Sequence, residues 1–424
     1  MTAMNTLPDT TTDMPRFDDG MLDLRELGRT LVETLVNEIM GAQADMLCDE
    51  GNSRNGYRER KLTTSVGQIT MKIPKLRMGT YFPDDMVNRY SRTDRAVVAA
   101  ISEMYATGVS TRKIEKVAAK LGVDKMSASQ VSRICAVLDE EVAALQNQTF
   151  EELEFPYLWI DATYIKARDD GHVASMAVVT VIGCDTGGMR RFIGFDVVDT
   201  ESYGSWKRFL EGLRVRGVHG VACVTSDAHE GLRRAISECF PGAAWQRCIV
   251  HLERNVCSLF RTRRQRAMAG KAMQAVFKES DPAMVREAYH VAIEVLGKMS
   301  SAAEELLEEA EADALTYLDF PVEHRRRLRT NNVQERSNRE IKRRSRVVQV
   351  FPSARSLIRL VGSVCAEINE DWSSRCYISP DSMALLNEER PKDAPQQATD
   401  EDRKRAERLI EVALESATKT RRAA

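Results

Sequence analysis

The sequence predicts an α/β protein whose mixed sheet is interrupted by an all-α segment and preceded by a mainly helical region. Two observations support this fold class. Apolar, β-rich runs at 157–166, 173–185 and 192–198 precede alternating helix and strand patterns that continue to residue 257. From 258 to 320 the pattern is instead helical throughout and rich in charge.

Length, cysteines and apolar runs limit the class of protein. The 424 residues suffice for about two to four domains, and an apolar content of 43 % can fill a sizeable core. The nine cysteines are odd in number and scattered, which is typical of reduced thiols in a cytosolic protein. The polar, acidic N-terminus is unlike a signal peptide, and the longest apolar stretch, Val173–Cys184, is too short to span a bilayer as a helix. We therefore expect a soluble cytoplasmic protein with no membrane partner.

The formal net charge of −2 hides strong segregation of charge. Residues 1–50 hold three Arg against eleven acids, whereas residues 51–81 hold seven Lys and Arg against one Glu. Residues 301–320 hold seven acids and no base, whereas residues 322–346 hold ten bases against three acids. Basic blocks of this size indicate surfaces that contact phosphates, although a solvated charged face is the alternative.

The N-terminal region combines a helix with a basic ribbon. Residues 1–19 are expected to be disordered, and apolar residues at helical spacing from 21 to 48 predict one amphipathic helix with a core or dimer contact. Alternating apolar residues within 55–83 predict a short β-hairpin. Its basic side chains suit a DNA backbone, with any basic hairpin as the alternative; the candidate contacts are Arg58, Arg60, Lys61, Lys75 and Arg77.

Residues 94–145 show three helical segments. Gly108 ends the first, and the second runs from Ser110 to Gly122. Ser127-x-x-Gln130 is a capping box that opens the third. Two helices joined by a short Gly-containing turn match a helix-turn-helix, with an ordinary three-helix packing unit as the alternative. In a helix-turn-helix the side chains that read base edges would be Ser127, Ser129, Gln130 and Arg133.

The order of elements after residue 153 narrows the fold class. Gly-containing turns make the first three strands an antiparallel meander, which is followed by a helix, a strand and a second helix. This is the order of the ribonuclease-H-like fold, in which one acid lies on the first strand and another just after the fourth; Asp161 and Asp227 occupy those places. The two turns are at 170–171 and 186–188, the two helices at 205–216 and 230–239, and the strand between these helices at 221–225.

A third acid, Glu335, opens a basic helix that runs to Arg346, and a second amphipathic helix follows within 350–372. The tail from Pro391 predicts a charged, peripheral helix. Three carboxylates that converge from strands and a helix provide hard oxygen ligands, which suit two Mg²⁺ or Mn²⁺ ions better than zinc. Each acid has an alternative role: strand-end Asp residues often cap helices or form turns, and Asn332-x-x-Glu335 fits a capping box.

Six ordered motifs between Asn55 and Trp372 resemble the Mutator-like transposases of bacterial insertion sequences. These motifs are NGYRERKLTTSVG with IPKLRMGTYFP, IDATYIKAR, SDAHEGL, RCIVHLERNV, RTNNVQERSNREIKRR and VFPSARSLIRLV with the Asp-Trp pair at 371–372. The resemblance implies a ribonuclease-H-like core with a helical insertion and a DDE triad at Asp161, Asp227 and Glu335. It places the family's Cys-x-x-His on Cys248 and His251, and a basic residue on Lys342.

The resemblance also implies an activity: binding of terminal inverted repeats in double-stranded DNA, metal-dependent cleavage, and transfer of the 3′ ends to target DNA by a homodimer or larger assembly. Two rivals are a non-catalytic DNA-binding regulator and a nuclease of the same fold without strand transfer. The triad favours catalysis over the regulator.

Helical spacing aligns Glu335 with basic residues that could hold the cut strand. The candidate DNA contacts on this helix are Asn338, Arg339, Lys342, Arg343 and Arg346. Cys248 and His251 suggest zinc, but a structural zinc site needs four ligands and no second pair has a usual spacing. A place beside the acids, contacting DNA or bracing them, is the preferred role for His251.

These observations divide the chain into seven segments. In order they are an N-terminal tail and helix, a basic hairpin, a helix-turn-helix, the first part of the core, an all-α insertion, the second part of the core and a C-terminal tail. Their boundaries are 1–50, 51–93, 94–150, 151–257, 258–325, 326–390 and 391–424.

Overall fold

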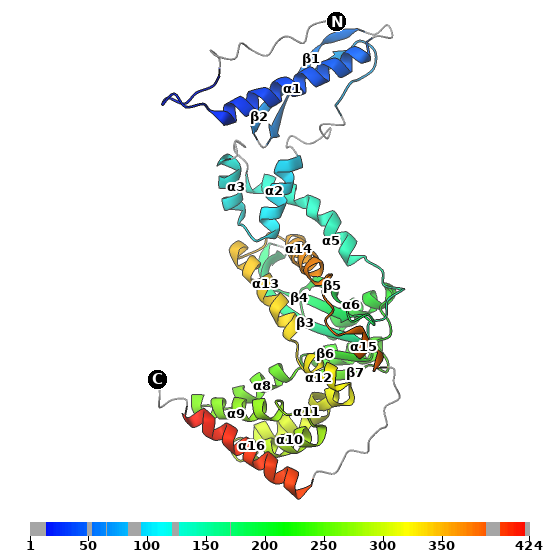
Figure 1. Ribbon diagram of the computed structural model, residues 1–424, viewed down its shortest axis with the longest axis vertical. Coiled ribbons are helices and arrows are strands. Elements are labelled where there is room, and N and C mark those ends of the chain that lie inside the picture. Colours follow the sequence, from blue (N-terminus) through cyan, green and yellow to red (C-terminus); the bar gives the residue numbers. More distant parts are fainter. Residues whose placement is uncertain are drawn as a thin grey trace. The chain divides into compact units, whose positions relative to one another are not determined.

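The computed structural model describes residues 14–48, 53–64, 66–83, 95–120, 127–169, 171–386 and 399–419. The chain divides into two compact units, Met1–Glu140 and Glu141–Ala424 (Figure 1). Four predicted features lie outside the described ranges: the end of the second helix at Gly122, the turn residue Asp170, the start of the C-terminal tail at Pro391 and the first thirteen residues.

In the first unit, α1 (Leu24–Met46) packs against the antiparallel hairpin of β1 (Arg54–Thr64) and β2 (Gly67–Leu76). Asp23 caps α1 by accepting from the backbone N–H groups of Arg25 and Glu26. The alternating apolar side chains of β2 are buried against α1, as the sequence pattern predicts. Residues 14–19 were expected to be disordered; instead, a turn there closes with a bridge between Arg16 and Leu22.

A helical cluster follows, formed by α2 (Arg95–Ala106), α3 (Thr111–Lys120) and α4 (Ala128–Ile134); the next helix, α5 (Leu138–Gln146), crosses the boundary between the two units. The Ser127–Gln130 capping box at the start of α4 is confirmed. The third predicted helix is wrong as one continuous element, because a 3₁₀ turn at Cys135–Val137 separates α4 from α5. The buried Cys135 lies in this turn, so tertiary packing overrides the helical pattern there.

The second unit contains a five-stranded mixed sheet in the order β5-β4-β3-β6-β7. The antiparallel meander is confirmed, and β6 and β7 then add in parallel to β3. The strands are β3 (Tyr157–Asp169), β4 (His172–Cys184), β5 (Arg190–Val198), β6 (Cys223–Ser226) and β7 (Ala244–Arg247). The start of β3 is apolar at consecutive positions because this central strand is covered on both faces.

Side chains alternate between the two faces of β3. Leu158 and Ile160 join a core formed with α6 (Tyr203–Val215) and α7 (Glu230–Cys239). Helices α13 (Asn332–Val348) and α14 (Ala354–Trp372) also contact β3. Trp159 lies on the face opposite to Leu158, and the alternation of side chains places Asp161 on the same face as Trp159. The short helices α12 (Val322–Leu328) and α15 (Pro380–Ala384) lie in the same unit.

Helix α8 (Ile249–Ser258) leads from β7 into a helical bundle of α9 (Arg263–Val276), α10 (Pro282–Gly297) and α11 (Ser301–Leu315), and a 3₁₀ turn at Thr316–Asp319 follows. The prediction that the C-terminal helix is peripheral is wrong. Helix α16 (Asp400–Lys419) packs against α9 and α10 (Figure 1), with Ala406 and Ile410 fully buried. Arg403 adds ion pairs with Glu287 and Glu294. Within the described ranges, no helix is both long and apolar enough to cross a membrane.

Candidate active site

Asp161 and Asp227 come from neighbouring parallel strands. Trp159 of β3 is in register with Thr225 of β6, so each acid lies two residues beyond this pair, at the same level of the sheet. Asp227 follows the last residue of β6 and accepts from the N–H of Ala228 at 2.7 Å. The charge of Asp227 acts on Asp161 and raises its pKa. Strand order and register therefore bring these two acids together.

The first turn of α13 is fixed to β3 and β4 by buried amide side chains. Asn331 donates to the carbonyl of Ile160 at 2.8 Å, and Gln334 donates to the carbonyl of Trp159 at 2.6 Å. Gln334 also donates to the carbonyl of Thr180 and accepts from its hydroxyl at 2.9 Å. Asn331 and Gln334 are fully buried, so these contacts fix the position and rotation of the helix.

One turn further on, Asn338 donates to Oδ2 of Asp161 at 2.8 Å. Glu335 lies between Gln334 and this contact, at the start of the same helix. The capping-box alternative for Glu335 is wrong. The N-cap residue is Asn331, which makes no side-chain capping bond, and the Glu335 carboxylate accepts instead from Arg254 at 2.5 Å.

Helix α8 presents two basic side chains to the acids. His251 lies close enough to Asp161 and Asp227 for both carboxylates to raise its pKa, and Arg254, one turn later, pairs with Glu335. Burial raises the pKa of Asp161 to about 6, although His251 and the bonds from the Ala162 N–H and Asn338 oppose this. A hydrogen bond with Cys248 is the main cause that raises the pKa of His251 to about 9, against the effect of burial. The raised pKa favours the positively charged form of His251 beside the acids.

Two buried polar atoms near the acids have no hydrogen-bond partner: Nδ1 of His251 and Oδ1 of Asn338. In the described part of the chain, no three Asp, Glu, His or Cys side chains are grouped closely enough to hold a metal ion. Asp161 and Asp227 act electrostatically on His251, and Glu335 pairs with Arg254 one turn of α13 before the contact of Asn338 with Asp161. Cys248 is buried and accepts from the N–H of Asn331.

The basic residues of α13 differ in their surroundings. Arg339, Lys342 and Arg346 are exposed, whereas Arg343 is engaged in an ion pair with Glu340. Asn338 is buried and contacts Asp161, so it is a residue of the acid site. Helical spacing puts Lys342 on the same side as Glu335 and Asn338, as the sequence indicates.

The basic residues of the hairpin do not share one face. Arg58 and Arg60 lie opposite Ile73 and Met71 in the strand register, on the side that packs against α1. Lys61 lies opposite Thr70, on the other side. Arg58, Lys61, Lys75 and Arg77 are exposed, and the guanidinium of Arg60 lies over the ring of Phe82 at 5.4 Å.

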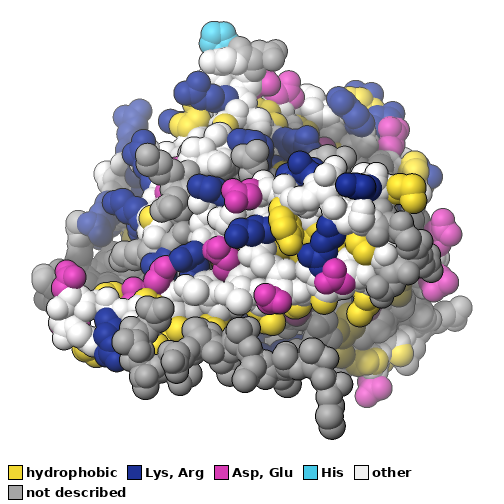
Figure 2. Space-filling view, turned by 90° about the horizontal axis from the view of Figure 1, so that it is seen from above, with side chains coloured by type: hydrophobic (Ala, Val, Ile, Leu, Met, Phe, Trp, Pro, Cys, Tyr) yellow, Lys and Arg dark blue, Asp and Glu magenta, His cyan; other side chains and the backbone are white. Residues whose placement is uncertain are grey.

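The start of α4 is held by its cap. Oε1 of Gln130 accepts from the N–H and the hydroxyl of Ser127, and the Ser127 hydroxyl also contacts Ser129. Arg133 is exposed on the same helix. Figure 2 views the molecule from above and shows Lys and Arg side chains spread over that face, with acidic and apolar side chains between them.

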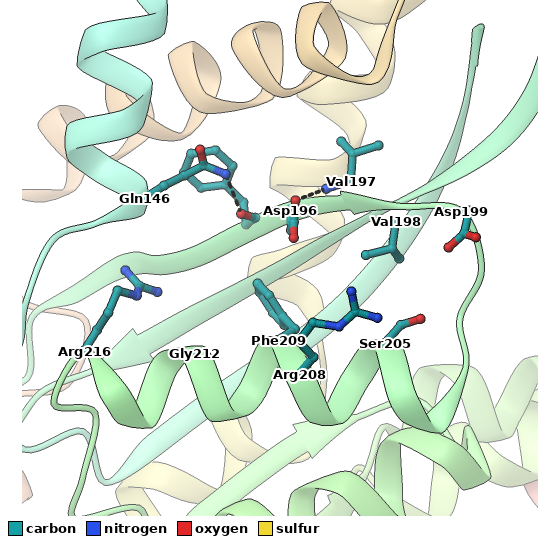
Figure 3. Close-up of a pocket in the computed structure, with 11 residues that line it drawn as sticks. Gln146, Asp196, Val197, Val198, Asp199, Ser205, Arg208, Phe209, Gly212 and Arg216 are labelled. Atoms are coloured by element: carbon teal, nitrogen blue, oxygen red, sulfur yellow. Dashed lines mark hydrogen bonds between the residues drawn. The ribbon is translucent and has the colours of Figure 1, made fainter. Parts of the chain in front are cut away.

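The pocket in Figure 3 is separate from the acids. It has a volume of about 390 Å³ and lies between β5 and α6, where it is lined by Asp196, Arg208, Phe209 and Arg216 among others. None of Asp161, Asp227 and Glu335 lines it. Burial raises the pKa of Asp196.

Sequence reasoning missed Arg254, Asn331 and Gln334. The i, i+3 spacing of His251 and Arg254 could have indicated two basic groups on one face of α8. Asn331, Gln334 and Asn338 likewise recur at helical spacing, but polar residues at the start of a basic helix are usually interpreted as its solvent-facing side.

Comparisons with known proteins show the family of this chain. A sequence model described as "Transposase, Mutator family" matches residues 8–375. The transposase for insertion sequence element IS1081 of Mycobacterium tuberculosis is 37 % identical over 389 residues, which cover 88 % of this chain and 93 % of that protein. The transposase for IS256 in transposon Tn4001 of Staphylococcus aureus is 34 % identical over 369 residues, covering 84 % and 94 %.

Among solved structures, the Drosophila P element transposase strand transfer complex is similar to 81 % of this chain and 94 % of that chain, with 13 % identity and a TM-score of 0.27. That likeness is too low to support a conclusion. The family match spans most of the chain and the bacterial relatives exceed 30 % identity, so the chain belongs to the Mutator family of transposases.

Proposed function

We propose that this transposase is catalytically active, and that Asp161, Asp227 and Glu335 form the acidic centre that cleaves DNA at the ends of its element and joins the 3′ ends to target DNA. The observation that carries the proposal is that Asp161, within β3, and Asp227, directly after the adjacent β6, lie at the same level of the sheet, with α13 fixed across them by Gln334 and Asn338. The sheet order and the helices between β7 and α13 fit a ribonuclease-H-like core with an all-α insertion.

The donor set fits a hard divalent cation such as Mg²⁺ or Mn²⁺, with two ions expected. Carboxylate oxygens are the ligands these ions prefer, and Asp161 is a carboxylate whose burial disfavours its charge unless a cation is near. Asp161, Asp227 and Glu335 would hold the ions, which would lower the pKa of a bound water or 3′-hydroxyl and stabilise the leaving oxygen.

The chain's own residues prepare this centre. Gln334 and Asn331 set the rotation of α13, and Asn338 orients the carboxylate of Asp161. His251 and Arg254 are the basic side chains that face the acids. Arg254 is a side chain that Glu335 would release when it takes up a ligand role.

Double-stranded DNA is the proposed partner, contacted by the exposed basic residues of α13 and by the hairpin. Arg339, Lys342 and Arg346 extend along α13 from the acid site and suit the phosphates of the cut strand. The cluster α2–α4 is proposed to act as a helix-turn-helix, with Arg133 exposed for base contacts. The proposed site of action is the bacterial cytoplasm. The proposed form of the protein on DNA is a homodimer or a larger assembly of this chain.

Single substitutions of the acids test the proposal. Asp161→Asn, Asp227→Asn and Glu335→Gln should each abolish cleavage of DNA that carries the element's inverted repeats, while binding to that DNA stays near the wild-type level. Asp199→Asn is the matched control, because Asp199 is an exposed acid at the end of β5. Cleavage by Glu335→Gln at the wild-type rate would remove Glu335 from the centre.

A further inference from the structure

Aromatic rings hold two arginine side chains at the edge of the sheet where β5 begins. The ring of Phe192 stacks on that of Trp372, with the ring centroids 5.5 Å apart. The guanidinium of Arg190 contacts both Trp372 and Tyr377, at 4.2 Å and 4.4 Å from their ring centroids. The guanidinium of Arg327 lies 4.9 Å from the centroid of the same Tyr377 ring. These contacts fix the positions of two cationic groups beside each other.

A third guanidinium, that of Arg336 on α13, adds its charge to this group. Burial lowers the pKa of Arg190 below its usual range, and the nearby charges of Arg336 and Arg327 lower it further. Within the described ranges, no carboxylate pairs with any of the three guanidinium groups. Asp185, the acid closest to Arg190 in the sequence, is engaged by Arg191 at 3.1 Å. The three side chains, Arg190, Arg327 and Arg336, are called the arginine cluster below.

The arginine cluster has the donors and the charge to bind an anion. Nε of Arg190 is a buried donor without a hydrogen-bond partner, and such a group is costly to leave unpaired. Arg190 and Arg327 are partly exposed and Arg336 is exposed, so an anion can approach from solvent. The planar fork of a guanidinium matches two oxygens of a phosphate group, and an anion would also relieve the repulsion between the three like charges.

Strand register places the arginine cluster on the same face of the sheet as the acids. Arg190 is in register with Cys184 of β4, which is in register with Tyr157 of β3. Tyr157 and Asp161 are four residues apart on β3, so their side chains lie on the same face. Four residues along the strand and two strands across correspond to roughly 17 Å between the Cα atoms of Asp161 and Arg190.

We propose that the arginine cluster binds a backbone phosphate of DNA a few nucleotides away from the phosphodiester that is cut. The inference rests on the proposed function, since it takes DNA as the partner and the acids as the cutting centre. One DNA strand advances about 3.4 Å per nucleotide along the duplex, so roughly 17 Å corresponds to about five nucleotides. A phosphate contact at this distance fixes the position of the duplex over the acids without reading its sequence.

The salt dependence of DNA binding tests the contact. Full-length protein is titrated, in EDTA and at several salt concentrations, against a labelled duplex that carries the inverted repeat. The double variant Arg327→Gln/Arg336→Gln should bind roughly eightfold more weakly at about 0.1 M salt, and the log–log slope should fall by about 0.9. Arg326→Gln is the matched control, because Arg326 is exposed on the same helix as Arg327, and it should bind like the wild type.

Replacing single phosphates of the duplex by neutral methylphosphonates locates the contact. At one linkage, about five nucleotides from the cut, the wild type should lose the same eightfold while the double variant loses nothing further. At every other linkage the two proteins should lose equally. The single variant Arg336→Gln, altered only at an exposed side chain, should show its coupling at the same linkage, and its urea unfolding midpoint should equal that of the wild type.

The outcomes separate this inference from the proposed function. A coupled linkage far from the fifth nucleotide would support the phosphate site and contradict the placement of the cutting centre at the acids. No coupled linkage at any position would overturn the phosphate site, because the cluster would then hold another anion or none, and would leave the acid centre unaffected. An equal loss of affinity in Arg326→Gln would also overturn it, since the effect would then be one of general charge.

Discussion

Gln334 is the side chain on which the placement of Glu335 should depend most. The variant Gln334→Met keeps nearly the same length and volume but can neither donate to the carbonyls of Trp159 and Thr180 nor accept from the Thr180 hydroxyl. Gln334 and Thr180 are fully buried, so water cannot replace the lost bonds without opening the structure. Each of the three buried groups that loses its partner costs about 1–3 kcal/mol, and the burial of the Met side chain offsets part of the sum. We expect a loss of about 2–4 kcal/mol in the free energy of unfolding of the second unit.

Tryptophan fluorescence during urea unfolding can measure this loss. All four Trp residues of the chain, at 159, 206, 245 and 372, lie in the second unit, so their signal does not include the unfolding of the first. Arg339→Met is the matched control, because Arg339 is exposed on the same helix and its loss should change stability by less than about 0.5 kcal/mol.

The same variant should also reduce cleavage. A displacement of about 1 Å at a catalytic group can lower a rate by roughly a hundredfold, and Glu335 is the residue next to Gln334. An unfolding midpoint equal to that of the wild type would refute the account of how α13 is held. Normal stability together with slow cleavage would likewise show that Gln334 does not anchor the helix.

Three further predictions concern separate parts of the molecule. Burial raises the pKa of Asp161 from 3.8 to about 6, so ionisation of Asp161 destabilises the fold as the pH rises from about 4 to 6. Asp161→Asn should therefore raise the free energy of unfolding at pH 7.5, in EDTA, by up to about 3 kcal/mol. Urea unfolding at pH 4 should show no increase of this size. Ile410 of α16 is fully buried where this helix packs against α9 and α10, so Ile410→Ala should lower the free energy of unfolding by about 2–4 kcal/mol. An unchanged thermal midpoint would mean that α16 does not pack there in solution. Lys342→Ala should lower the log–log slope of DNA affinity against salt by roughly one unit, and a slope equal to the wild type's would exclude a phosphate contact.

Local patterns in the sequence predicted the strands and helices that form the site. The apolar run before Asp161 and the one before Asp227 are long enough to specify strands, and their order predicted that the two acids meet. Glu335 was also predicted from the sequence, at the start of a basic helix, and the motif resemblance grouped it with the two Asp residues.

Long-range packing explains what the sequence did not reveal. The burial of Gln334 depends on carbonyl groups of β3 and β4 more than 150 positions away, and a polar residue in a basic helix gives no sign of this. Helix α16 has the charge pattern of a surface helix, but Arg403 pairs with Glu287 and Glu294 more than 100 positions earlier. Arg254 was missed for the same reason, since its partner Glu335 is 81 positions away.

The central claim is that Asp161 acts as a metal ligand in DNA cleavage, and a change of ligand hardness tests it most directly. Mg²⁺ binds oxygen and disfavours sulfur, whereas Mn²⁺ accepts softer ligands more readily. The measurement is the ratio of the cleavage rates in Mn²⁺ and in Mg²⁺, compared between Asp161→Cys and the wild type. If Asp161 binds the metal, Asp161→Cys should be inactive in Mg²⁺ and partly active in Mn²⁺, so its ratio should rise well above the wild-type ratio, while Asp161→Asn stays inactive in both. An Asp161→Cys protein that cleaves in Mg²⁺ with the same ratio as the wild type would contradict the claim.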